Sequence, residues 1–200
     1  MNAILFFNGW GMDASIHSHM KVPENSDFFS LTFPYDFDFK ILKEYEKIYF
    51  IGWSFGVFYM ADFISKHQEY LPEKIYTVSI NGIPHLMEKE NLNKRVIVLT
   101  YKNLDEKNLN LFYKKIGIEN FHSKKSISEL RDELKYFTDN YYFINQNCID
   151  KAFISDNDLI IKSETQKIYY KKHNIPFVEI EGTHYIFHAF DEWKYFLGEI

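Results

Sequence analysis

The stretch that decides the fold is KIYFIGWSFGVFYMADFISKH at residues 47–67. Its opening run, KIYFIG, is short, apolar and β-rich, which predicts a strand buried on both faces. The apolar residues of VFYMADFISKH recur at helical spacing, which predicts a helix. Between the two lies GWSFG at 52–56, a G-x-S-x-G pattern whose strand–turn–helix context is typical of a nucleophilic serine, here Ser54. The alternative is a glycine-bracketed turn that carries an incidental serine.

The same alternation of strand-like and helix-like segments covers most of the chain on either side of this stretch. Short apolar runs predict further strands at 3–7, 28–33, 74–80, 152–155 and 177–180. Helical segments are predicted at 37–46, 162–173 and 186–197, and the last of these would close the chain. Strands that alternate with helices imply βαβ units. The expected fold class is therefore α/β, with a mostly parallel central sheet and helices on both faces.

The stretch from about 84 to 147 interrupts this alternation. It is rich in Lys and Asn, and it contains the helical patterns NLNLFYKKIG and SISELRDELKYFTDNYYF. Within it, RVIVLTY at 95–101 favours a strand by propensity, which competes with the helical interpretation. No Pro-, Gly- or Ser-rich linker separates the stretch from its neighbours. We therefore expect a single domain over 1–200, with an inserted helical lid at about 84–147.

Composition excludes several classes of protein. The 200 residues are 46% hydrophobic and 26% charged, which is typical of a globular domain. A net charge of −5 argues against a general nucleic-acid binder. A single cysteine, Cys148, forms no internal disulfide and offers no zinc cluster, and no stretch reaches the roughly 18 apolar residues that a membrane span needs. We expect a protein without metal or membrane contact, located in the cytoplasm.

A serine nucleophile needs a histidine base and an acid that orients the base. Among the eight histidines, His184 follows the last predicted strand directly, whereas His188 lies on the predicted closing helix. His17 and His19 lie near the first glycine-rich turn and lack the pattern of a third metal ligand. Where the nucleophile follows a strand in this way, the three catalytic residues occur along the chain in the order Ser, acid, His. The acid is therefore expected between Ser54 and His184, and Ser155-Asp156-Asn157-Asp158, which follows a predicted strand, offers two aspartates. Both aspartates are candidates, and either also suits a turn or a helix cap.

An oxyanion hole requires two backbone N–H donors. One is expected from Phe55, the residue after the nucleophile. The other is expected from Trp10, within the Asn8–Gly11 turn that follows the first strand. The simpler interpretation of that turn is a glycine-rich loop with a packed tryptophan.

Four motifs together resemble one family. NGWGMD at 8–13, GWSFGV at 52–57, SING at 79–82 and EGTH at 181–184 resemble the short pimeloyl-ACP methyl ester esterases of the BioG type, which are α/β-hydrolases. The chain is also similar to the longer BioH-type esterases, which have HGWG where this chain has Asn8-Gly9-Trp10-Gly11. Their acid lies in a G-x-x-D pattern, and residues 155–158 fit it with serine in place of glycine. The resemblance therefore favours Asp158 over Asp156.

The resemblance implies hydrolysis of the methyl ester of pimeloyl-acyl-carrier protein for biotin synthesis, with no metal or organic cofactor. The partner would be the acidic carrier protein. Residues 84–147 carry 11 basic and 9 acidic residues, a net charge of +2, and the rest of the chain carries −7. Arg95 and Arg131 are the two arginines of this stretch and are candidates for carrier binding. The alternatives are a thioesterase, a general short-chain carboxylesterase, or a catalytically silent hydrolase-fold binding protein.

Overall fold

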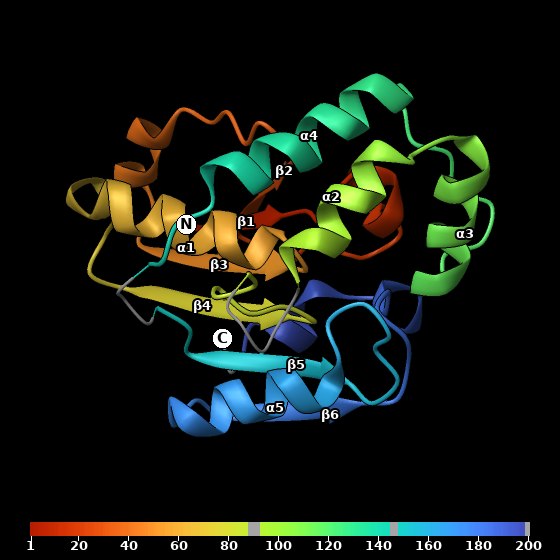
Figure 1. Cartoon of the computed structure of the whole chain (residues 1–200). Helices are drawn as coiled ribbons and strands as arrows, with labels where there is room; N and C mark the ends of the chain where they lie inside the picture. Colours follow the sequence, from red (N-terminus) through yellow and green to blue (C-terminus); the bar gives the residue numbers. More distant parts are fainter. Residues whose placement is uncertain (88–92, 145–147, 199–200) are drawn as a thin grey trace.

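The centre of the molecule is a six-stranded sheet in which every strand pair is parallel (Figure 1). The computed structural model describes residues 1–87, 93–144 and 148–198, so parts of the predicted insertion, 88–92 and 145–147, lie outside the described residues. The strands are β1 (Asn2–Phe7), β2 (Ser26–Leu31), β3 (Lys47–Trp53), β4 (Ile75–Ile80), β5 (Lys151–Ser155) and β6 (Phe177–Ile180). They are the strands that the apolar runs predict, and the expected α/β class is confirmed.

The strand order places a crevice beside the predicted nucleophile. The order is β2-β1-β3-β4-β5-β6, so the chain leaves β1 toward one edge for β2 and then crosses to β3 on the other side. In such sheets, ligands bind at the carboxyl ends of the strands where the direction of winding switches. In the register of β1 and β3, Phe7 pairs with Gly52. The turns that follow these strands therefore lie side by side at the switch point.

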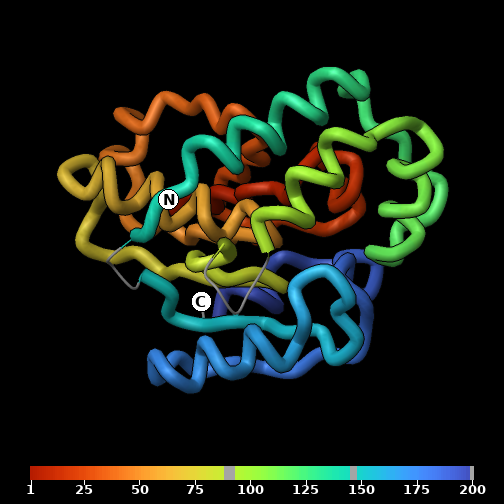
Figure 2. Tube along the Cα trace, viewed as in Figure 1, coloured from red at the N-terminus to blue at the C-terminus, as the bar shows by residue number. Residues whose placement is uncertain are grey.

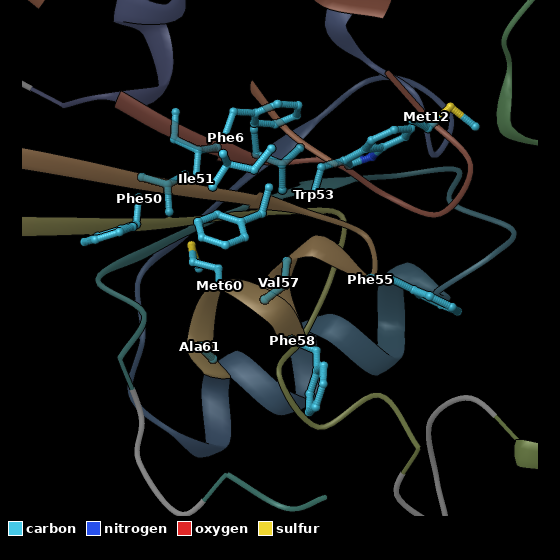
Figure 3. Packing of buried hydrophobic residues seen from close by; sticks show 14 of the residues in the cluster. Phe6, Met12, Phe50, Ile51, Trp53, Phe55, Val57, Phe58, Met60 and Ala61 are labelled. Atoms are coloured by element: carbon cyan, nitrogen blue, oxygen red, sulfur yellow. The ribbon is translucent and has the colours of Figure 1, made fainter. Parts of the chain in front are cut away.

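Successive side chains of the sheet pack against different layers. The ring of Phe7 lies 5.6 Å from that of Phe63 on helix α1 (Gly56–His67). Phe6 points to the other face, with ring distances of 5.3 Å to Phe187 and 4.8 Å to Trp193. Figure 3 shows the same division, with Phe6 on one side of the strands and Phe50 and Met60 on the other. Rings thus fill both faces of the sheet.

The two faces carry different kinds of helix. Helices α1 and α5 (Ser163–Lys172) cover one face, and α5 matches the predicted 162–173 segment (Figure 1). The opposite face is covered by short 3-10 turns, η1 (Ala14–His17), η4 (Phe187–Ala189) and η5 (Trp193–Phe196). Two further 3-10 turns, η2 (Phe39–Glu44) and η3 (Gln68–Tyr70), lie outside this layer, and η2 occupies the predicted 37–46 segment.

The predicted closing helix at 186–197 is wrong. The chain forms η4 and η5 there, separated by Phe190 in an extended conformation. The cause is a backbone pairing with a distant segment. The N–H of Lys21 donates to the carbonyl of Asp191 at 2.7 Å, and the N–H of Trp193 donates to the carbonyl of Lys21 at 3.1 Å. These bonds replace the helical ones, and no local pattern in the sequence reveals them.

Along the chain, three helices follow β4 and precede β5, in the stretch where the insertion is predicted (Figure 2). They are α2 (Lys94–Lys102), α3 (Glu106–Ile116) and α4 (Ile127–Asn140), and α2 packs against α4. This packing overrides the strand propensity of 95–101, and the Asn93 side chain caps the helix by accepting the N–H of Arg95 at 2.8 Å. The longest helix that the structure describes is α4, with 14 residues, and none in the described ranges has the length and apolar character to cross a membrane.

Histidine 17 makes the stability of the fold sensitive to acid. Its side chain is buried against Phe6, Phe28 and Trp193, and desolvation lowers the pKa of His17 to about 4. The unfolded chain keeps a histidine pKa of about 6.5 and therefore takes up the proton first as the pH falls. The stabilisation is complete above pH 6.5 and is lost as the pH falls toward 4. From pH 7 to pH 5 we expect the free energy of unfolding to fall by about 2 kcal/mol through this group alone.

Urea unfolding at pH 7 and pH 5 measures this effect in the wild type and in His17→Gln. Glutamine keeps a hydrogen-bonding group toward Ser30, whose Oγ lies 3.0 Å from Nε2 of His17. It does not titrate in this range, so the variant is expected to lose about 2 kcal/mol less than the wild type between the two pH values. Equal losses in the two proteins would contradict the assignment.

Candidate active site

Ser54 lies on a strained turn between β3 and α1. Its φ is +57°, in the left-handed region that residues with a Cβ rarely adopt. The turn is tight because α1 begins against the end of β1. A Cβ on Gly56 would collide with the carbonyl oxygens of Phe7 and Asn8, so only glycine fits at this position. The predicted role of the glycine bracket is thus visible in the packing.

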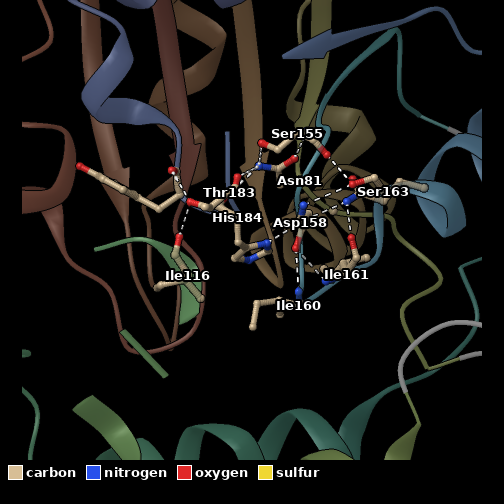
Figure 4. Close-up of polar contacts among 12 residues, drawn as sticks. Asn81, Ile116, Ser155, Asp158, Ile160, Ile161, Ser163, Thr183 and His184 are labelled. Atoms are coloured by element: carbon tan, nitrogen blue, oxygen red, sulfur yellow. Dashed lines mark hydrogen bonds and ion pairs between the residues drawn. The ribbon is translucent and has the colours of Figure 1, made fainter. Parts of the chain in front are cut away.

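His184 and Asp158 form a buried pair at the same edge of the sheet (Figure 4). Nδ1 of His184 lies 2.8 Å from Oδ2 of Asp158, and both side chains are almost completely buried. The other carboxylate oxygen accepts the backbone N–H groups of Ile160 at 2.8 Å and Ile161 at 3.0 Å. The amide of Gln166 donates to Oδ2 at 3.0 Å. These donors stabilise a negative charge on Asp158 and fix its orientation toward the imidazole.

Asp156, the other candidate acid, has a different place. Its side chain is exposed, and Oδ1 accepts the backbone N–H of Gly182 at 3.0 Å. The carbonyl of Gly182 in turn accepts the N–H of Asn157 at 3.1 Å. Asp156 therefore shapes the loop that carries His184, whereas Asp158 contacts the imidazole itself.

Trp10 and Phe55, the two predicted oxyanion donors, both line the cavity that contains Ser54 and His184. Within the part of the chain that the structure describes, neither backbone N–H has a hydrogen-bond acceptor in the protein. The Trp10 side chain is anchored, because its indole N–H donates to the carbonyl of Leu130 on α4 at 2.9 Å. The turn after β1 and the residue before α1 thus each contribute to the cavity wall a residue whose backbone N–H has no acceptor among the described residues.

The cavity has a volume of about 510 Å³ and is walled mainly by apolar side chains of the insertion. Ser54 and His184 are among its lining residues, and further polar groups come from Thr100 on α2, from Asn103 directly after α2, and from Asn108 and Lys115 on α3. Three apolar lining residues are more than half exposed to solvent: Val96 and Leu99 on α2, and Leu111 on α3. Their exposure places the mouth of the cavity between these two helices.

The two predicted carrier-binding arginines lie outside this lining. Arg95 is exposed near the start of α2, and Arg131 is exposed on α4, where its guanidinium donates to the carbonyl of Leu104. Among the described lining residues the basic side chain is Lys115, which the sequence does not single out.

The remaining histidines that the sequence raises have other partners. Nε2 of His19 lies 3.0 Å from the carbonyl oxygen of Phe187, and the ring of His188 stacks on Tyr185. His17 is part of the aromatic layer described above. Across residues 1–87, 93–144 and 148–198, no group of three or more His, Cys, Asp or Glu side chains is arranged to hold a metal ion.

A sequence model of the family described as pimeloyl-ACP methyl esterase BioG matches residues 1–196. The chain belongs to the BioG family. The family is one of carboxylic ester hydrolases, as the motifs predict.

Several other proteins are similar to this chain at low sequence identity. The crystal structure of BioG from Haemophilus influenzae superposes with a TM-score of 0.84 at 23% identity, over 98% of this chain and 94% of that one. An uncharacterized protein of Haemophilus influenzae is 27% identical over 96% of this chain and 92% of its own length. A malonyl-acyl-carrier-protein O-methyltransferase of Bacteroides fragilis is 27% identical over 92% of this chain, which spans 39% of that longer protein. RedJ, a thioesterase of Streptomyces coelicolor, shares the fold at 11% identity, with a TM-score of 0.60.

Two residues of this BioG-family chain position His184 without having been predicted to do so. The side chain of Asn81 donates to the carbonyl of His184 at 2.9 Å and to Oγ of Ser155 at 2.6 Å, which ties the ends of β4 and β5 to the histidine loop (Figure 4). The indole of Trp53 donates to the same carbonyl at 2.9 Å. Asn81 follows β4 directly, within SING, and its place after a strand was the available signal.

Proposed function

We propose that this chain is the serine esterase that hydrolyses the methyl ester of pimeloyl-ACP in biotin synthesis. The observation that carries the proposal is the buried Asp158–His184 pair, which shares one cavity with Ser54 in a chain of the BioG family. Asp158 fixes the imidazole tautomer with the proton on Nδ1, so that Nε2 is free to act as a base.

The proposed reaction has two halves. His184 takes the proton of Ser54 as its Oγ attacks the ester carbonyl, and the oxyanion is held by the N–H groups of Trp10 and Phe55. The tetrahedral intermediate collapses when His184 gives the proton to the leaving methoxide, which departs as methanol and leaves an acyl-enzyme. Water then attacks the acyl-enzyme, assisted by the same histidine. This step releases the free carboxylic acid and restores Ser54.

The shape of the cavity supports an aliphatic acyl group. Its apolar walls suit the methylene chain of pimelate, because burial of each CH₂ contributes about 0.8 kcal/mol. With the methyl ester at Ser54, the chain would run toward the mouth at Val96, Leu99 and Leu111. The carrier end of the substrate would then emerge between α2 and α3.

Charge on the same two helices supports an acidic carrier protein as partner. Residues 94–116 hold six basic and two acidic residues, a net charge of +4 in a chain whose total is −5. The basic side chains of this stretch are all exposed: Lys94, Arg95, Lys102, Lys107, Lys114 and Lys115. A positive rim around the mouth would attract a negatively charged carrier and its phosphate-bearing arm. We propose the insertion as the lid and docking element of a single domain.

Purified wild-type protein is expected to release methanol from pimeloyl-ACP methyl ester. The double variant Lys102→Glu/Lys107→Glu should lower kcat/KM for this substrate about tenfold or more at low ionic strength, because two attractive charges become repulsive. Hydrolysis of p-nitrophenyl butyrate should stay within about twofold, since neither lysine lines the cavity. The matched control is Lys171→Glu/Lys172→Glu on α5, which makes the same charge change at exposed positions outside the lining.

Each alternative function gives a different result. Hydrolysis of p-nitrophenyl butyrate without cleavage of the carrier ester would leave a serine hydrolase and remove the carrier assignment. Folded protein that neither hydrolyses an ester nor reacts with a fluorophosphonate would be a silent binding protein. Equal losses on both substrates in the α2/α3 variant would indicate damage to the fold rather than to docking.

A further inference from the structure

The segment from Ser123 to Glu133 holds the predicted oxyanion turn at three points. The indole N–H of Trp10 donates to the carbonyl of Leu130 at 2.9 Å. Oγ of Ser123 donates to the carbonyl of Gly11 at 3.1 Å. The backbone N–H of Gly11 donates to Oε1 of Glu133 at 3.4 Å. The insertion thus contacts the backbone next to the proposed oxyanion donor as well as covering the cavity.

Glu133 is a buried acid with a single cationic partner among the described residues. Its side chain is 4% exposed, and Oε2 lies 2.8 Å from Nζ of Lys125, which also donates to the carbonyl of Phe33 at 3.3 Å. Burial raises the pKa of Glu133 above its usual range, and the charge of Lys125 opposes this rise. Apolar side chains of similar volume often replace such a pair without loss of stability. Stability alone is therefore a weak reason for a carboxylate at this position.

The conformation of the turn supplies a stronger reason. Gly11 has a φ of +70°, in the left-handed region that glycine adopts without strain. Because glycine adopts other φ values as readily, the backbone of Gly11 does not by itself fix the shape of the turn. Its N–H belongs to the peptide unit that directly follows Trp10. An acceptor that holds this N–H limits rotation of the peptide and, with it, the direction of the Trp10 N–H. Displacing such a donor by a fraction of an ångström weakens its bond to the oxyanion.

We infer that Glu133, which is paired with Lys125, is a positioning residue for the oxyanion hole, acting through the N–H of Gly11. The inference rests on the mechanism proposed above. In this view α2 and α3 form the mouth through which the substrate enters, whereas α4 controls the geometry of the turn that carries Trp10. What the turn requires at position 133 is a hydrogen-bond acceptor, and the ion pair offsets the cost of burying the charge of the carboxylate that supplies it.

Two double variants test the acceptor, because both lack the ion pair and they differ in whether the side chain at position 133 has an amide oxygen. Lys125→Met/Glu133→Leu removes both charges and the acceptor, and kcat for p-nitrophenyl butyrate is expected to fall about 10- to 100-fold, with KM within about twofold. Lys125→Met/Glu133→Gln removes both charges but keeps an amide oxygen for the Gly11 N–H, and it should recover most of the lost kcat. Asp132→Leu, at the adjacent exposed position on α4, is the control for a carboxylate-to-leucine change.

Thermal unfolding and the rate of fluorophosphonate labelling are measured on the same proteins. The labelling rate reports reaction at Ser54 without any ester, and it should follow the order of kcat. Wild-type rates in both double variants would overturn the inference, and so would equal losses in both, because the acceptor would then make no difference. A wild type that does not react with the fluorophosphonate would instead remove the proposed mechanism, and this inference with it.

Discussion

Replacing Ser54 by alanine is expected to lower kcat for ester hydrolysis on the order of 10⁶-fold while leaving the fold intact. The reason is that the reaction as proposed passes through a bond to Ser54 Oγ, and alanine offers no nucleophile. The fold should tolerate the change because both residues carry a Cβ, so the strain of the +57° backbone conformation is the same. What is lost is one hydroxyl at the edge of a cavity.

Three measurements test this expectation together: kcat on pimeloyl-ACP methyl ester, labelling by a fluorophosphonate, and the midpoint of thermal unfolding. Ser65→Ala is a suitable control, since it removes a hydroxyl from α1 that donates to the carbonyl of Asp62 at 2.8 Å, away from the cavity. The control should keep wild-type activity. Activity in Ser54→Ala within tenfold of the wild type would place the nucleophile elsewhere.

The parts of this molecule that could be predicted from the sequence are those with a local cause. The strand at 47–53 and the helix at 56–67 each follow from the residues within them, and GWSFG supplies the turn between the two. The position of His184 after β6 could also be predicted, because the carboxyl ends of parallel strands meet at one edge of the sheet. The α/β class and the family resemblance follow from such local signals in their chain order.

The parts that could not be predicted depend on partners far away in the chain. Asn81 and His184 are 103 positions apart, and Gly11 and Glu133 are 122 apart, so nothing near either residue indicates the contact. The closing segment fails as a helix for the same reason, since Lys21 pairs with its backbone. The sequence contains these side chains, but the fold decides which of them meet.

The insertion illustrates a different limit. Arg95 and Arg131 remain candidates for carrier binding, because guanidinium groups bind phosphate and carboxylate well and a docking residue need not line the cavity. Composition does not indicate which side of a helix faces the cavity, and Arg95 and Arg131 lie outside its lining. The net charge of the whole insertion also does not indicate how charge is distributed among its helices. The modest excess over 84–147 becomes a net charge of +4 once α2 and α3 are considered apart from α4.

Replacement of the two candidate acids by asparagine is expected to have very different effects on catalysis. Asp158→Asn is expected to lower kcat about 10⁴-fold, whereas Asp156→Asn should stay within about threefold. Asp156 is exposed and accepts one N–H, from Gly182, and the oxygen of an asparagine can accept that bond equally well. The two substitutions remove the same charge two positions apart, so each is the control for the other.

Asparagine at 158 fails because of the donors that surround the site. In the wild type, one carboxylate oxygen faces the N–H groups of Ile160 and Ile161, and the other faces Gln166 and His184. An amide that keeps its oxygen toward the two backbone donors turns its NH₂ toward Nδ1 of His184. The imidazole must then accept at Nδ1 and carry its proton on Nε2, where it cannot take a proton from Ser54. The opposite orientation sets the NH₂ against two N–H donors and is unfavourable.

The measurement is kcat and KM of both asparagine variants on p-nitrophenyl butyrate, with the pimeloyl-ACP methyl ester as second substrate. KM for the small ester should change little in either variant, because neither aspartate lines the cavity. A larger loss in Asp156→Asn than in Asp158→Asn would transfer the acid role to Asp156. A small loss in both would mean that the tautomer of His184 is fixed by other contacts. Asn81 and Trp53 hold only the carbonyl of His184 and leave the ring nitrogens unconstrained, so the imidazole is expected to depend on Asp158.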